Sequence, residues 1–194
     1  MINPEKFEPR LVHTLGVLAR AEANGNNMAG AVRHAEQAVN RLERLVVTDR
    51  KRYEPELAAG LGALSDYYRA ADRDPQRAFS PAQRAADIYA RLDRERGSYR
   101  ADLARALHRL GELWARGDPR RALEPMGRAV DAYDAAIKTG SAATLMNVDL
   151  ARSLLELGFL NVRAGRNNEA VANVARAVQI IDELARTSVR SGSC

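Results

Sequence analysis

The sequence has few cysteines, few aromatic residues and no long apolar run, and each scarcity excludes a class of protein. One cysteine, Cys194, in a chain of 194 residues cannot form an internal disulfide framework or a thiolate metal cage. Aromatic residues make up 5% of the chain and β-branched residues are sparse, which argues against a β-sandwich or barrel. No stretch approaches the roughly 20 apolar residues that span a bilayer, and the polar N-terminus lacks the apolar core of a signal peptide. We therefore expect a cytoplasmic protein whose fold depends on packing alone.

Alanine and arginine are abundant instead. The chain contains 35 alanines, and arginine supplies 27 of its 30 basic residues. Alanine, leucine, arginine and glutamate are strong helix formers, so the composition predicts an all-α protein. The formal net charge of +5 is a weak indication of acidic partners.

Four internal repeats give the clearest pattern in the sequence. Phe7–Leu11 matches Tyr53–Leu57 and Tyr99–Leu103 at intervals of 46 residues, and Met146–Leu150 is a weaker fourth copy. Each start is followed by a pair of leucines, namely Leu15 and Leu18, Leu61 and Leu64, Leu107 and Leu110, and Leu154 and Leu157. Two alanines seven residues apart come next, namely Ala31 and Ala38, Ala78 and Ala85, Ala122 and Ala129, and Ala170 and Ala177. Four aligned copies of this kind predict a stacked helical array.

Each copy has the periodicity of two helices separated by a turn. Leu11, Leu15 and Leu18 have the spacing of one helix face, and the alanines form a stripe on the second helix. Asp74 and Asp118 each precede a proline, which predicts an N-cap with proline at the first helical position. The pattern predicts eight helices, near residues 7–23, 28–48, 53–72, 75–96, 99–116, 119–138, 143–164 and 167–187. We interpret the chain as a single solenoid with repeats near 7–52, 53–98, 99–146 and 147–187, followed by a flexible tail at 188–194.

The fourth copy resembles the tetratricopeptide repeat. Leu157-Gly158, with Ala170 and Ala177 twelve and nineteen residues after the glycine, has the spacing of that motif. The third copy, with Leu110-Gly111, is similar, whereas the first two copies have alanine and serine where the family prefers glycine. The usual period is about 34 residues, so this longer form resembles the repeats of kinesin light chains and of proteins from high-GC actinobacteria. The resemblance implies a right-handed α-solenoid that acts as a non-enzymatic protein- or peptide-binding adaptor.

Residues that carry chemistry are scattered. The three histidines, His13, His34 and His108, have no ligand spacing among themselves, and Cys194 lies at the far end of the chain. None of the three lysines belongs to a phosphate-binding loop. We therefore expect no catalytic residue, no cofactor and no metal.

The resemblance also implies where a ligand would bind, because in that family the first helix of each repeat lines a concave groove. The spacing places Arg105 beside Arg152 and Arg116 beside Arg163, and rows of guanidinium groups suit carboxylate recognition. An acidic partner segment is the corresponding prediction. The family's lysine and asparagine clamp for C-terminal carboxylates is absent from these positions. The predicted groove residues are Arg20, Arg69, Arg105, His108, Glu112, Arg116, Arg152, Phe159 and Arg163.

Several alternatives stay open at this point. With 27 arginines, a solvated face that binds nothing would also carry several of them. A regulatory or oligomerisation module that senses a peptide or small molecule is the second interpretation, and an enzyme on a helical scaffold is the third. Nucleic-acid binding is disfavoured because only Phe159 is placed to stack on bases.

The last predicted helix is more apolar than one packing stripe requires. A solenoid normally closes with a polar helix, because the apolar flank of each repeat needs a neighbour. The surplus predicts a homodimer, or docking onto another protein, through the C-terminal repeat. The residues of this predicted surface are Val171, Val174, Val178 and Ile181.

Overall fold

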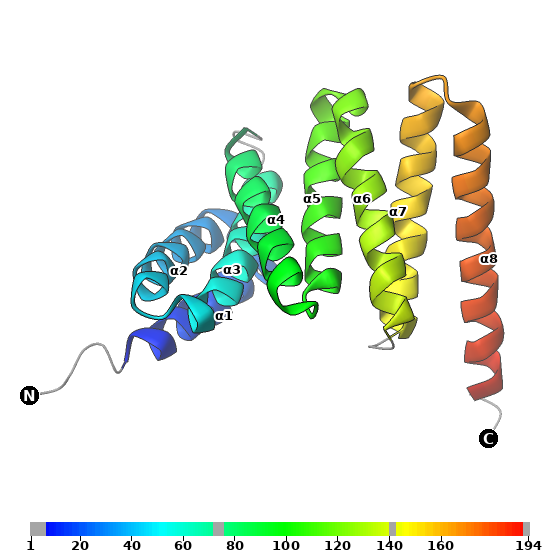
Figure 1. Cartoon of the computed structure of the whole chain (residues 1–194). Helices are drawn as coiled ribbons and strands as arrows, with labels where there is room; N and C mark the ends of the chain where they lie inside the picture. Colours follow the sequence, from blue (N-terminus) through cyan, green and yellow to red (C-terminus); the bar gives the residue numbers. More distant parts are fainter. Residues whose placement is uncertain (1–6, 72–75, 140–142, 192–194) are drawn as a thin grey trace, which may run out of the picture. The chain divides into compact units, whose positions relative to one another are not determined.

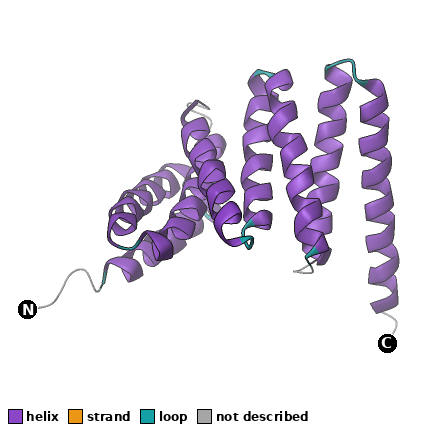
Figure 2. Ribbon diagram, viewed as in Figure 1, coloured by secondary structure: helices purple, strands orange, loops and turns teal. Residues whose placement is uncertain are grey.

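The chain is all-α over the part described by the structure, a computed structural model that covers residues 7–71, 76–139 and 143–191. These residues form eight helices and no strand (Figure 2). The helices are α1 (Glu8–Asn24), α2 (Met28–Thr48), α3 (Arg50–Ala71), α4 (Gln76–Arg96), α5 (Arg100–Gly117), α6 (Pro119–Lys138), α7 (Ala143–Arg163) and α8 (Asn167–Ser191). The predicted fold class and the order of helices are therefore confirmed.

Two helix ends differ from the prediction by more than one residue. Helix α3 begins at Arg50, three residues early, because the Asp49 carboxylate accepts the backbone N–H of Arg52 at 3.1 Å and caps the new first turn. Helix α8 continues to Ser191, four residues past its predicted end and into the segment predicted as a flexible tail. The rest of that tail, residues 192–194, lies outside the described residues, as does the predicted N-cap Asp74.

Other helix ends follow their local sequence. The predicted cap Asp118 is confirmed, since its carboxylate accepts the backbone N–H groups of Arg120 and Arg121 at 3.1 and 3.4 Å, with Pro119 at the start of α6. The turn between α7 and α8 contains Gly165 at φ 76°, a left-handed conformation that a side chain would strain.

The chain forms two compact units, residues 1–92 and 93–194, which we describe separately. In unit 1, α1 packs on α2 and α2 packs on α3. Ser65 of α3 also donates a hydrogen bond to the carbonyl of Ala78 in α4, at 2.9 Å. In unit 2, α5, α6 and α7 each pack on the helix that follows, and α5 also contacts α7 (Figure 1).

The small residues of each repeat lie where helices approach most closely. All eight alanines of the repeat pattern are buried. The residue after the second leucine is also buried in every copy, as Ala19, Ser65, Gly111 and Gly158. A Cβ added at Gly158 would lie 2.7 Å from Cγ2 of Val174, so α7 and α8 are too close there for a larger residue. The repeat pattern therefore marks the contact surface between the paired helices.

One predicted core position is wrong. Leu18, the second leucine of the first copy, has 41% of its surface exposed, whereas its counterparts Leu64 and Leu110 are buried. The described residues contain no hairpin before α1 that could cover this side chain. Leu157, the counterpart in α7, is partly buried against a small core of Ala122, Met126 and Leu160.

Candidate functional site: the α5/α7 face

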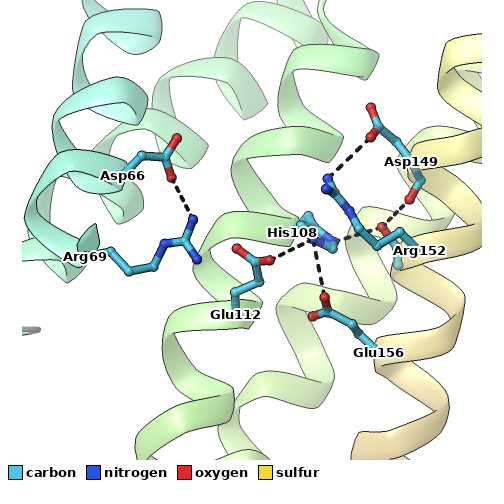
Figure 3. Close-up of polar contacts among 8 residues, drawn as sticks. Asp66, Arg69, His108, Glu112, Asp149, Arg152 and Glu156 are labelled. Carbon is cyan, nitrogen blue, oxygen red and sulfur yellow. Dashed lines mark hydrogen bonds and ion pairs between the residues drawn. The ribbon is translucent and has the colours of Figure 1, made fainter. Parts of the chain in front are cut away.

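Polar side chains from α5 and α7 gather on one surface of unit 2, which we call the α5/α7 face (Figure 3). The first helix of each of the last two repeats forms this surface. Its polar residues are Asp102, Arg105 and Glu112 of α5, and Asp149, Arg152 and Glu156 of α7. His108 of α5 lies beneath them.

His108 is buried, with 4% of its surface exposed, although its position predicted a groove residue. Its Nδ1 atom lies 2.9 Å from Oγ of Ser153 in α7. Ser153 is itself fully buried and donates its hydroxyl proton to the backbone carbonyl of Asp149 at 2.8 Å. A hydroxyl has a single proton, so Ser153 must accept the bond from His108, and Nδ1 carries a hydrogen. The second ring nitrogen of His108 is Nε2.

Two carboxylates face that second nitrogen. An oxygen of Glu112, one turn along α5, lies 3.4 Å from Nε2 of His108, and an oxygen of Glu156 in α7 lies 4.0 Å away (Figure 3). Nε2 is buried and makes no hydrogen bond to any residue that the structure describes. The nitrogen and both carboxylate oxygens lie within 4.8 Å of one another, close enough to hold one ion.

The arginines of the face are paired with acids on their own helices. Arg105 donates to Asp102 at 2.6 Å, and Arg152 donates to Asp149 at 3.3 Å, each across three residues. Partial burial acts to lower the pKa of Arg105, but the hydrogen bond and charge of Asp102 and the nearby Asp149 hold it above its ordinary value. The face is therefore a mosaic of both charges instead of a purely basic surface.

The other predicted groove residues of unit 2 lie toward the ends of these helices. Arg163 of α7 donates to the backbone carbonyl of Ala115 in α5 at 3.3 Å, which ties the two helix ends together. Arg116 and Phe159 are exposed.

The remaining predicted groove residues belong to unit 1. Arg69 pairs with Asp66 across one turn of α3, with 3.7 Å between the charged groups. Arg20 of α1 is exposed and lies close enough to Tyr67 to lower the pKa of that phenol, although burial outweighs it and the pKa is raised. Within unit 2, the structure thus brings Arg105, His108, Glu112 and Arg152 together on the α5/α7 face.

Sequence reasoning missed the cluster around His108. It considered histidine and cysteine spacing, and it did not consider carboxylates from a neighbouring helix. One part of the signal was present, because His108 and Glu112 are four residues apart and so share a helix face. Glu156 and Ser153 become neighbours only when α7 packs beside α5.

The predicted apolar surface of α8 is exposed. Its four residues recur at intervals of three, four and three residues, which places them on one side of the helix. Their exposed fractions are Val171 70%, Val174 37%, Val178 50% and Ile181 46%. Among the described residues, no helix combines the length and apolar character needed to cross a membrane.

No protein-family model matches the chain, and no curated protein matches it. Several solved structures are similar. BtubC (BKLC) from P. vanneervenii is 22% identical, with a TM-score of 0.75 over 92% of this chain and 66% of that one. A putative kinesin light chain of Podosopora anserina with nearly identical TPR-like repeats is 17% identical, with a TM-score of 0.54 and full coverage of both chains. MamA is 19% identical, with a TM-score of 0.50 over 93% of this chain and 84% of that one.

These likenesses confirm the resemblance seen in the sequence. The chain has the fold of tetratricopeptide-like helical repeats, and it spans just under two thirds of the length of BtubC. The identities, all below 25%, show the fold alone.

Proposed function

We propose that the chain is a non-enzymatic, cytoplasmic scaffold whose α5/α7 face binds an acidic segment of a partner protein. The observation that carries the proposal is the set of arginines that two neighbouring helices present on one surface. Arg105, Arg116, Arg152 and Arg163 come from α5 and α7, and the side chains of Arg105 and Arg152 are more than half exposed.

The internal ion pairs do not prevent such binding. An exposed ion pair three residues apart contributes about 0–1 kcal/mol, so a partner carboxylate can displace it at little cost. Arg105 and Arg152 each use one nitrogen in the pair with aspartate, and a guanidinium has five N–H donors. Each arginine therefore keeps donors for a second carboxylate, which it can bind through two parallel hydrogen bonds.

A labelled Glu- and Asp-rich peptide tests this proposal by fluorescence anisotropy at low salt. We expect wild type to bind and Arg105→Glu/Arg152→Glu to bind at least tenfold more weakly. The control is Arg120→Glu/Arg128→Glu, which makes the same charge change on exposed arginines of α6 in the same unit. Equal losses in the two double variants would show that the peptide senses net charge only, and the α5/α7 face would be removed from the proposal.

We further propose that a second copy of the chain covers the apolar stripe of α8. The stripe of Val171, Val174, Val178 and Ile181 repeats with the alternating spacing of a coiled-coil seam. Such a stripe is complementary to itself across a two-fold axis, because each copy offers the same row to the other. Four large apolar side chains exposed in a row also favour burial in an interface.

Light scattering at micromolar concentration checks the oligomeric state. We expect twice the chain mass of 21.3 kDa for wild type and the monomer mass for Val178→Glu. Val47→Glu is the matched control, because Val47 of α2 is 86% exposed and lies outside the stripe. A monomeric wild type would rule out the second copy as the occupant.

A further inference from the structure

Helix α3 buries two stripes of residues, and α1 buries only one of the two corresponding stripes. The first stripe is buried in both helices, as Val12, Leu15 and Ala19 in α1 and as Ala58, Leu61 and Ser65 in α3. The second stripe is buried only in α3, as Tyr53, Leu57 and Leu64. Its counterpart in the first repeat, which we call the α1 row, consists of the N-cap residue Phe7 with Leu11 and Leu18, which are 49%, 39% and 41% exposed. Isolated exposed apolar side chains are ordinary, but a row whose repeat counterparts are buried indicates a contact surface.

Helix α2 covers the second stripe of α3. Gly60 lies within that stripe, and a Cβ added there would lie 3.3 Å from Cδ1 of Leu42 and 3.5 Å from Cγ2 of Val39. Both of these residues belong to α2, and Ala35, four residues before Val39, is buried with them. The stripe of α3 is therefore packed by a helix that offers one small and two branched apolar side chains along one side.

The same arrangement recurs inside unit 2. Val130 and Tyr133 of α6 occupy the repeat positions of the two branched residues of α2, and they share one core with Met146 and Leu150 of α7. In each unit, the stripe is thus covered by the second helix of the preceding hairpin. Among the described residues, no helix precedes α1. The α1 row therefore has the composition of a surface that packs against a helix.

The charges of α1 favour an acidic helix as the partner. Both acids of α1, Glu8 and Glu22, lie within hydrogen-bonding distance of side chains of α2. Arg10 and Arg20 are exposed, and Arg10 directly precedes Leu11 of the α1 row. A helix with glutamate or aspartate beside its apolar residues would therefore meet a surface of complementary charge.

We propose that the α1 row is a docking site for an amphipathic helix of a partner protein. That helix carries apolar residues at the spacing of Ala35, Val39 and Leu42, with acidic residues beside them. Helices that dock in this way present their anchors at positions i, i+4 and i+7, which is the spacing of these three residues. The proposal uses no residue of the α5/α7 face or of the α8 stripe, so it does not depend on the function proposed for either.

The test uses a labelled synthetic peptide of residues 28–48 that carries Arg33→Glu and Arg44→Glu. This peptide keeps the apolar residues of α2 and is acidic at two positions that are exposed on α2. Fluorescence anisotropy measures its affinity for the full chain. We expect wild type to bind the peptide and Leu18→Glu to bind it at least tenfold more weakly, because docking would bury an unpaired carboxylate. The same peptide with Val39→Glu should lose at least tenfold in affinity for wild type.

Val17→Glu is the matched control for Leu18→Glu. Val17 is 42% exposed and Leu18 is 41% exposed, so the two variants make the same charge change at equally exposed positions of one helix. Val17 lies about 100° around the helix from Leu18, and its counterparts in the third and fourth copies are Arg109 and Glu156. Val17→Glu should therefore bind the peptide within about twofold of wild type. Circular dichroism checks that the helices of both variants are intact.

Light scattering separates this proposal from the contact proposed for α8. Leu18→Glu should keep the oligomeric state of wild type, and Val178→Glu should bind the peptide as wild type does. A monomeric wild type that binds the peptide would remove the dimer and support the docking site. The proposal is overturned if wild type does not bind the peptide or if Val17→Glu and Leu18→Glu lose the same affinity. It is also overturned if Leu18→Glu dissociates the wild-type dimer, because a second copy would then cover the α1 row.

Discussion

The two units each bury a charged cluster built on the same plan but with opposite balance. In unit 1, Glu54 is buried between Arg50, four residues earlier on α3, and Arg91 of α4. In unit 2, His108 is buried between Glu112, four residues later on α5, and Glu156 of α7. The first cluster has one acid and two cations, whereas the second has one weak base and two acids.

The difference shows what each cluster can do. Glu54 is satisfied from within the chain, so its ion pairs hold α3 and α4 together and need no ligand. His108 has an unsatisfied nitrogen that faces two negative groups. The cluster of unit 1 is therefore structural, whereas the cluster of unit 2 leaves Nε2 of His108 without a hydrogen bond among the described residues.

The largest effect is expected when the structural cluster is broken. Arg91→Met keeps most of the side-chain volume but leaves the buried Glu54 with Arg50, whose side chain is 59% exposed. Removing one partner of a buried charge should lower the free energy of unfolding by about 2–3 kcal/mol. Urea denaturation measures this change.

Arg84→Met is the control for that variant. Arg84 pairs with Glu43 at 2.6 Å, but both side chains are at least 40% exposed. Its loss should cost no more than about 1 kcal/mol. Equal losses for Arg84→Met and Arg91→Met would mean that the cluster around Glu54 is no more structural than a surface ion pair.

A smaller effect is expected at the close approach of α7 and α8 in unit 2. Gly158→Ala places a Cβ 2.7 Å from a methyl of Val174, whose branched side chain turns with difficulty. Overpacking outweighs the better helix propensity of alanine, and we expect a loss of about 1–2 kcal/mol. Gly127→Ala in α6 meets nothing within 4 Å and should gain about 0.5–1 kcal/mol instead. If thermal or urea denaturation showed that both variants change stability in the same direction, the close packing at Gly158 would be contradicted.

Two tyrosines extend the comparison between satisfied and unsatisfied groups. The Tyr68 hydroxyl in unit 1 bonds to Glu36 and accepts from Arg77 at 3.0 Å. The Tyr133 hydroxyl in unit 2 is buried with no partner in the described part of the chain. Tyr68→Phe should therefore lose about 1 kcal/mol of unfolding free energy, and Tyr133→Phe should gain about 1 kcal/mol. If both variants lose stability in urea, Tyr133 has a partner after all.

The smallest effect appears at alkaline pH. Burial and the charge of Asp149 raise the pKa of Tyr133, with Arg105, Arg152 and Arg109 acting in the opposite direction. The unfolded chain ionises this phenol near pH 10 while the folded chain keeps it protonated, so folding loses stability as the pH rises past 10. The loss is about 0.4 kcal/mol at pH 10 and grows above it. Between pH 9 and 11, the urea midpoint of Tyr133→Phe should fall less steeply than that of wild type. Parallel plots of midpoint against pH would show that the ionisation of Tyr133 does not lower stability at alkaline pH.

Much of the fold could be predicted because the same local rules apply four times. Alanines at fixed intervals mark helix contacts, and Asp118-Pro119 marks a helix start through a local hydrogen bond. Leu18 was misplaced because helical spacing places it beside Leu15 but does not determine whether another helix covers it.

The candidate site was predictable only in part. Helical spacing predicted Arg105 and Arg152 on one face, and both side chains are exposed in the structure. Their pairing with Asp102 and Asp149, each three residues earlier on the same helix, could also have been predicted from spacing. The prediction considered the arginines because they are abundant, and it did not consider these acids. The cluster at His108 depends on the packing of α7 beside α5, which no local pattern encodes.

The contact between His108 and Ser153 joins two helices that are not consecutive in the chain. In a repeat array most coupling passes between nearest neighbours, so the last hairpin can fray while the rest stays folded. A buried hydrogen bond from α5 to α7 links the third repeat directly to the fourth. Opening of the last hairpin must break this bond, so the two repeats should exchange their amide hydrogens as one cooperative block.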